Sequence, residues 1–189
     1  MSLTAKRTER RFYKLSAAIL CLFVFASAQI FATGKTKLKD GRVIAKSAGA
    51  VMLNPEGVRV AVQLVPEERR KSQSLSARIA QVAPGKCLYL VFKNLQTEKQ
   101  PGELYHVYLN VEPGKTPNKA EQPAGVLNFY NARKDPRSDV FFSFDVTDAL
   151  RKLSVEKQLT EALTLTIIPA EPPAAGAVPT IGQIELVEQ

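Results

Sequence analysis

Short apolar runs, each closed by proline, glycine or charged residues, are the feature that most constrains the fold of this chain. In the run 58–65 every second residue is a branched aliphatic one: Val58, Val60, Val62 and Leu64. A period of two is typical of a β-strand with one buried face. Twelve Pro and ten Gly among 189 residues leave little room for long helices. The pattern therefore predicts strands joined by turns.

Eight runs of this kind can be recognised along the chain. The predicted strands are 58–65, 75–82, 87–92, 104–111, 126–130, 140–146, 163–168 and 181–187. One short helix is predicted near 148–153, with Thr147 or Asp148 as its N-cap. Strands 87–92 and 104–111 are expected to be neighbours, because only one polar connection separates them. The sequence thus predicts an all-β fold, an antiparallel two-sheet sandwich with jelly-roll or Greek-key connections.

The first 28 residues have the composition of a signal peptide. The basic stretch Lys6–Lys14 precedes the uncharged apolar run Leu15–Phe25, and Ala26 and Ala28 supply the small residues that signal peptidase requires. We expect cleavage after Ala28. The alternative is an N-terminal membrane anchor, because residues 15–33 carry no charge over nearly the length of a membrane span. In either case the rest of the chain is expected outside the cytoplasm, in the periplasm or the extracellular space.

Two further segments follow the predicted signal peptide. Residues 29–53 are expected to form a basic leader or linker that could include an edge strand, and residues 54–189 the β-sandwich domain. The formal net charge of the whole chain is +8, but five basic residues and one acidic residue lie in the first 28, so cleavage leaves +4. Much of the basicity is therefore targeting signal, and a nucleic-acid partner is not expected. Membrane contact is expected only through an uncleaved N-terminal segment.

Two residues are candidates for reactivity or ligand binding. Cys87 is the one cysteine left after processing, so the mature chain has no internal disulfide. This cysteine is either a buried apolar residue of its strand or an accessible thiol. His106 is the single histidine of the chain and shares a strand face with Tyr108. Cys87 and His106 lie on strands predicted to be adjacent, but no third metal ligand accompanies them.

The sequence assigns no catalytic, cofactor-binding or metal-binding residue. Serine residues occur without a glycine-rich nucleophile elbow, and His106 stands in no recognisable motif with a Ser or Asp. There is no phosphate-binding loop and no alternating carboxylate pattern for calcium. We therefore expect a protein that is not an enzyme and uses no cofactor.

Four blocks in this order carry a family resemblance. They are LYLVFKNLQTEKQPGELYHVYLNV at Leu88–Val111, VLNFYN at Val126–Asn131, FSFDVTDALRKL at Phe142–Leu153 and TIGQIELV at Thr180–Val187. Together they resemble the β-rich domain that follows the catalytic domain in bacterial tyrosinases and polyphenol oxidase-like proteins. Tyrosinases bind two copper ions through six histidines, and this chain has one histidine. The resemblance therefore implies the C-terminal β-sandwich domain of that family without the copper catalytic domain.

The resemblance also implies a function. In that family the domain packs over the copper site and shields it, so this chain would be a non-enzymatic exported accessory domain that contacts an exported type-three copper oxidase. Such a domain is expected to expose an apolar or aromatic patch, on the loops 112–123 or 131–139. The alternative is a structural or ligand-binding module of the cell envelope that is unrelated to an oxidase.

Overall fold

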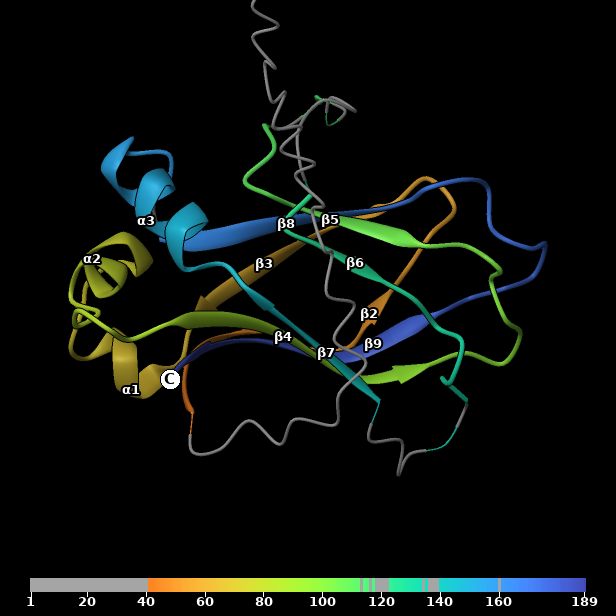
Figure 1. Cartoon of the computed structure of the whole chain (residues 1–189), viewed down its shortest axis with the longest axis horizontal. Helices are drawn as coiled ribbons and strands as arrows, with labels where there is room; N and C mark the ends of the chain where they lie inside the picture. The colour runs from red at the N-terminus through yellow and green to blue at the C-terminus, as the bar shows by residue number, and fades with distance from the viewer. Residues whose placement is uncertain are drawn as a thin grey trace, which may run out of the picture. The chain divides into compact units, whose positions relative to one another are not determined.

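The computed structural model describes residues 41–112, 114–115, 117, 123–133, 135, 140–159 and 161–189, all within one compact unit, Lys37–Gln189. These residues form nine strands and three short helices, which confirms the predicted all-β class (Figure 1). The strands are β1 (Arg42–Ser47), β2 (Val51–Met52), β3 (Val58–Leu64), β4 (Leu88–Gln96), β5 (Tyr105–Leu109), β6 (Gly125–Leu127), β7 (Phe141–Asp145), β8 (Ala162–Pro169) and β9 (Thr180–Glu188). The helices are α1 (Pro66–Arg69), α2 (Leu75–Ala80) and α3 (Thr147–Val155).

The strands belong to one antiparallel sheet rather than to two. Their order is β6-β5-β8-β3-β1-β9-β4-β7, with β2 paired to β9 outside this path. Strand β9 bonds to β1 on one side and to β4 on the other, and so joins the two halves of the sheet. The expected two-sheet sandwich is therefore not confirmed. A sandwich would consist of two sheets with no hydrogen bonds between them, whereas here hydrogen-bonded pairing continues strand by strand from β6 at one edge to β7 at the other.

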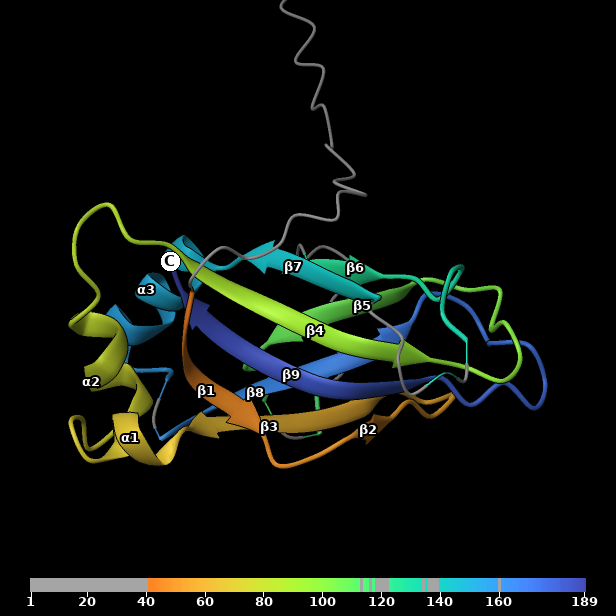
Figure 2. The same ribbon diagram turned by 90° about the horizontal axis from the view of Figure 1, so that it is seen from below.

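The sheet is curled so strongly that its two edge strands, β6 and β7, approach one another (Figure 2). The ring of Phe144 in β7 lies so close to Gly125 in β6 that a Cβ atom added to this glycine would overlap it. Within the described residues no backbone ladder connects β6 to β7. The result is a nearly closed barrel whose seam is filled by side chains.

Alternate residues of the strands fill the interior of the barrel. Fully buried examples are Val62, Leu90, Phe92, Val107, Leu165, Ile167 and Leu186. Aromatic rings pack edge to face within this core, with ring centroids 5.8 Å apart for Phe92 and Phe144 and 5.5 Å apart for Tyr105 and Phe129. Leu75 of α2 and Leu150 of α3 belong to the same core. The three helices lie together at one end of the barrel, which we call the helix end (Figure 1).

The strand predicted at 75–82 is wrong, because residues 75–80 form helix α2. The Ser74 side chain accepts a hydrogen bond from the backbone N–H of Ala77 at 3.1 Å, which makes Ser74 the N-cap. Leu75 and Ile79, four residues apart, are both buried. Their spacing places them on one face of a helix, and this face meets the core.

Two predictions about strand position also differ from the structure. The short apolar run after residue 41 forms β1, which lies between β3 and β9 rather than at an edge. Strands β4 and β5 were expected to be neighbours, and this is wrong: β4 pairs with β7 and β9, and β5 with β6 and β8. The physical reason is that residues 97–104 cross from one side of the barrel to the other instead of forming a tight hairpin.

Candidate functional site

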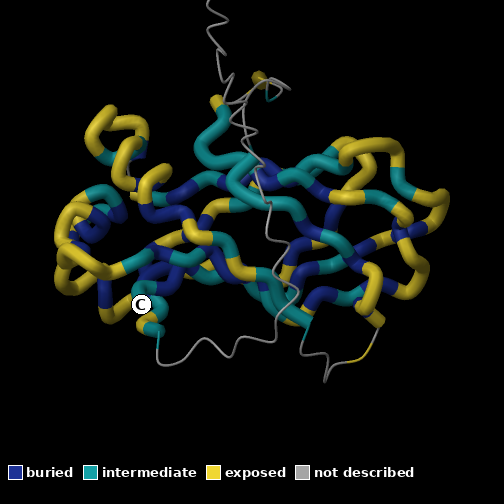
Figure 3. Tube along the Cα trace, viewed as in Figure 1, coloured by how far each residue is buried: buried dark blue, intermediate teal, exposed yellow. Residues whose placement is uncertain are grey.

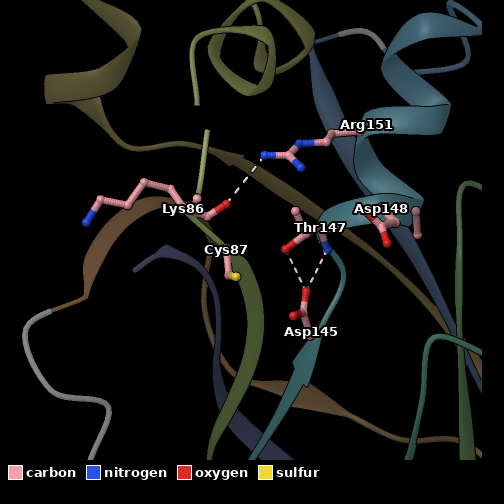
Figure 4. Close-up of a pocket in the computed structure, with 8 residues that line it drawn as sticks. Lys86, Cys87, Asp145, Thr147, Asp148 and Arg151 are labelled. Carbon is pink, nitrogen blue, oxygen red and sulfur yellow. Dashed lines mark hydrogen bonds between the residues drawn. The ribbon is translucent and has the colours of Figure 1, made fainter. Parts of the chain in front are cut away.

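Cys87 lies in a pocket at the helix end, immediately before β4 (Figure 4). The pocket has a volume of about 360 Å³. It is lined by Gly85, Lys86, Cys87, Asp145, Thr147, Asp148, Ala149 and Arg151. The thiol is half-buried and forms no disulfide, so neither of the two expected environments for Cys87 is fully realised.

The polar groups of this pocket hold α3 against β4. The carboxylate of Asp145 accepts hydrogen bonds from the backbone N–H and the hydroxyl of Thr147, at 2.9 and 2.6 Å (Figure 4). The same hydroxyl oxygen accepts the backbone N–H of Leu88 at 2.8 Å. Asp145, rather than Thr147 or Asp148, therefore supplies the oxygen that serves the start of α3. Because these groups bond to one another, they form a structural junction.

The pKa of Tyr89, which lies two residues after Cys87, is raised by burial and by nearby charge. Burial raises the pKa of this phenol, and the carboxylate of Asp145 and the neighbouring Cys87 raise it further. The backbone of Cys87 pairs with that of Gln189 through two hydrogen bonds, at 2.9 and 3.0 Å. In the described part of the chain, no three His, Cys, Asp or Glu side chains converge as metal ligands would. The pocket thus combines a thiol with structural hydrogen bonds.

His106 lies in the middle of β5, opposite Val126 of β6 and Ile168 of β8. Its ring stacks on Tyr108 with a centroid distance of 6.3 Å, and its buried Nδ1 atom has no hydrogen-bond partner. Because β5 does not pair with β4, the expectation that Cys87 and His106 lie on adjacent strands is wrong. The structure does not bring the two candidate residues into one site.

The predicted processing residues, Ala26 and Ala28, lie outside the described residues, so the signal peptide stays a prediction. None of the helices in residues 41–189 that the structure describes has the length and hydropathy needed to cross a membrane.

A surface that the sequence did not single out lies opposite the helix end. We call it the loop end and define it as the described parts of 52–57, 96–104, 128–135 and 170–180 (Figures 1 and 3). It carries four of the five exposed large apolar side chains among the described residues: Met52, Leu104, Tyr130 and Val178, of which Tyr130 is 69% exposed. The fifth, Val155, lies in α3 at the other end. Four of these five side chains therefore lie on segments at the same end of the barrel.

Hydrogen bonds tie the segments of the loop end to one another. The side-chain amide of Gln100 donates to the carbonyl of Ala132 at 3.0 Å, and the N–H of Ala174 donates to the carbonyl of Pro101 at 2.8 Å. The ammonium of Lys99 donates to the carbonyl of Ala175 at 2.6 Å. The segment 97–104 is therefore fastened to both of its neighbours, and the surface is held in one arrangement.

The sequence carries little signal for this surface. An apolar or aromatic patch was expected on 112–123 or 131–139, and most of those residues lie outside the described ones. Tyr130 immediately precedes the second of these ranges, whereas Met52 and Val178 lie outside both ranges and outside the predicted strands.

Solved structures of a polyphenol oxidase and of a tyrosinase resemble this chain over part of their length. Latent aurone synthase, a polyphenol oxidase from its natural source, matches with a TM-score of 0.41 and 16% identity, over 72% of this chain and 25% of that one. The same enzyme, recombinantly expressed and co-crystallised with hexatungstotellurate(VI), gives a TM-score of 0.41 and 16% identity, over 73% of this chain and 25% of that one. Latent apple tyrosinase gives a TM-score of 0.35 and 13% identity, over 75% and 27%. The structures that this chain resembles are thus a polyphenol oxidase and a tyrosinase, and the chain spans about a quarter of the length of those proteins.

The curated proteins include no match to this chain. Residues 41–189 match a family described as a domain of unknown function, DUF7868, and the match covers the whole nine-stranded body from β1 to β9. The chain belongs to the DUF7868 family.

Proposed function

We propose that this protein is a non-enzymatic, exported accessory domain that binds a type-three copper oxidase through its loop end. The observation that carries the proposal is the group of exposed apolar side chains, Met52, Leu104, Tyr130 and Val178, on loops that hydrogen bonds hold together. A few side chains provide most of the binding energy in protein interfaces, and tyrosine is enriched among them. A surface that is ordered before binding loses less conformational entropy when the partner docks.

The oxidase is proposed as the partner because the four ordered sequence blocks resemble the domain that covers the copper site in tyrosinases. The chain offers one histidine, and the six that such a copper pair requires would have to come from the partner. A cover domain that is a separate chain lacks the high effective concentration that a covalent linker supplies. Its affinity must therefore come from the interface itself, which makes the loop end the place to test.

The test compares substitutions at the two ends of the barrel. Replacing Leu104 and Tyr130 together by Ser should weaken binding by about thirtyfold or more, which corresponds to about 2 kcal/mol. Val155→Ser, a change of similar kind at the helix end, is the matched control and should leave binding unchanged. Because all three side chains are exposed, each variant should keep a stability within about 0.5 kcal/mol of the wild type.

The measurement uses the full chain, tagged and isolated from the cell envelope of its native host. The protein recovered with it is identified by its copper content and by its oxidation of diphenols. The proposal fails if no copper oxidase is recovered and the added protein leaves the diphenol oxidation rate of a purified type-three oxidase unchanged. Recovery that is equal for the wild type and the Leu104/Tyr130 variant would remove the loop end from the proposal.

A further inference from the structure

The outward side of strands β3, β8, β5 and β6 carries very little charge. These four strands are neighbours in the sheet, and their labels lie together in the upper half of Figure 1. Strand residues that alternate with buried core residues point outward. The middle of this outward side is formed by Thr164, Thr166, Ile168, His106, Tyr108 and Val126. We call it the neutral face, because Arg59 of β3 is the one charged side chain among the outward residues of these four strands.

Charged side chains lie around the neutral face rather than on it. The guanidinium of Arg59 donates to the carbonyl of Glu112 at 3.0 Å, so it is directed along the surface to the connection after β5. The described connections at the two ends of the four strands carry Glu56, Glu103, Glu112, Lys115, Glu161 and Glu171. A centre depleted of charge with a polar rim around it is the usual composition of a protein interface.

Aromatic and aliphatic side chains occupy the middle of the neutral face. The rings of His106 and Tyr108 stack with a centroid distance of 6.3 Å. Val126 of β6 and Ile168 of β8 lie directly opposite His106 on its two neighbouring strands. All four side chains are half-buried, so each still presents part of its surface to solvent. Covering apolar area of this kind with a second surface is favourable.

Two buried polar atoms of this face have no hydrogen-bond partner. They are Nδ1 of His106 and Oγ1 of Thr166. Thr166 lies directly opposite Tyr108, so the two atoms belong to neighbouring positions on β5 and β8. Rotation about a single side-chain bond exchanges each atom with a carbon atom on the other side of its own side chain. An imidazole nitrogen can then accept a hydrogen bond, and a threonine hydroxyl can donate one.

We infer that a second copy of this chain docks on the neutral face through a twofold axis. In a twofold pair, a contact from His106 to Thr166 of the second copy is matched by the reverse contact, so both unpartnered atoms acquire partners together. Identical surfaces also repel one another wherever they are charged, and the whole chain has a formal net charge of +8. The neutral face is a surface on which two copies meet without that repulsion. Because it is the convex side of a curled sheet, the contact area is small and the dimer is weak and transient.

The test is sedimentation velocity of the protein isolated from its native host, at concentrations from about 1 to 200 μM. The sedimentation coefficient of the wild type should rise with concentration. Tyr108→Lys places a cation at the middle of both faces and should weaken self-association about tenfold or more. Ser143→Lys adds the same charge at an exposed outward position of β7 and is the matched control, which should associate as the wild type does. A wild type that sediments as a monomer over the whole range would overturn the inference.

A charge-reversal pair locates the contact on this face. Tyr108→Glu should weaken self-association as Tyr108→Lys does, and an equimolar mixture of the two variants should associate about tenfold more strongly than either alone, because opposite charges then meet across the axis. The thermal unfolding midpoint of every variant is measured, and Thr164→Lys, at a half-buried outward position of β8, replaces Tyr108→Lys if the tyrosine variants lose their fold. Self-association that Tyr108→Lys and Thr164→Lys both leave unchanged would place the interface elsewhere and refute the inference.

The outcome for the oxidase separates this inference from the proposed function. The neutral face is distinct from the loop end, so Tyr108→Lys should leave recovery of the oxidase unchanged. If the protein forms the expected dimer and no oxidase is ever recovered, the proposed function is wrong while the inference stands. If the oxidase is recovered with a protein that stays monomeric at every concentration, the inference is wrong instead.

Discussion

Glu68 shows how a single carboxylate connects three parts of the molecule. Its side chain is 2% exposed and accepts hydrogen bonds from Arg78 of α2, at 2.6 Å, and from Arg42 of β1. Arg78 also forms an ion pair with Glu188 of β9. Burial by itself would raise the pKa of Glu68, but the hydrogen bonds from Arg78 and Arg42 lower the pKa below its ordinary value. The network thus fastens α1 and α2 to the two central strands.

Replacing Glu68 by Gln should lower the free energy of unfolding by about 3 kcal/mol near neutral pH, because Arg78 then loses the buried one of its two carboxylate partners. The pKa of Glu68 is lower in the folded than in the unfolded chain, so its contribution is present above about pH 4.5 and is lost as the pH falls through the folded-state pKa. Urea unfolding at several pH values measures this. Glu67→Gln, an exposed neighbour, is the control, and an equal acid dependence in wild type and Glu68→Gln would contradict the assignment.

Gly125 is the residue at which the seam of the barrel depends on the absence of a side chain. A Cβ atom there would overlap the ring of Phe144, which itself packs edge to face on Phe92. Gly125→Ala should therefore destabilise the protein by about 1 to 3 kcal/mol, the usual cost of overpacking a core. Thermal unfolding measures the change. Gly49→Ala is the control, since a Cβ at Gly49 meets no atom within 4 Å, and equal midpoints for the two variants would refute the close packing of the seam.

At the scale of elements, periodicity predicted which residues form strands better than it predicted which strands pair. The alternation at 58–65 and the apolar runs at 163–168 and 181–187 correspond to β3, β8 and β9. The strand prediction for 75–82 was wrong because its apolar residues fit both the strand period and the helix period. Ser74, the N-cap of α2, favours the helix. A short apolar run fits both the helical and the strand period, so the residue at its N-cap has to decide between helix and strand.

Neighbour relations depend on contacts between residues far apart in the sequence, and no local pattern reports them. Strand β9 pairs with β1 and β4, although it is the last of the nine strands in the described chain. Surface exposure is equally hidden from the sequence: Met52 ends strand β2 and is exposed, whereas Val51 beside it is buried. The sequence therefore predicted the class of the fold and the helix α3, while the single sheet and the loop end required coordinates.

Helix α2 is predicted to depend on its cap. Ser74→Ala removes the acceptor for the N–H of Ala77 and should cost about 1 kcal/mol, or about 2 to 4 °C in the unfolding midpoint of a domain of this size. Ser74→Asp, which restores an acceptor, should return the midpoint to near the wild-type value. The variants are compared by circular dichroism during heating, and a failure of Asp to rescue the loss would speak against the cap.

At the scale of the molecule, the two ends of the barrel have different chemistry. Ion pairs around the buried Arg78 hold the helix end together. Polar groups that line its pocket beside Cys87 form hydrogen bonds within the protein. The loop end exposes apolar side chains and carries an excess of carboxylates in three of its segments. Under the proposed function the helix end supports the fold and the loop end contacts the partner, and the substitutions at Val155 and at Leu104 and Tyr130 compare the two ends.

The central place of β9 has a consequence for how the protein acquires its structure. Residues 180–188 supply ladder partners of both β1 and β4, so the two halves of the sheet cannot be joined before this segment has been synthesised. Contacts between such distant segments are slow to form, because a long stretch of chain must first be closed into a loop. Until that moment β1 keeps only its ladder with β3 and β4 only its ladder with β7, so the barrel stays open along its middle.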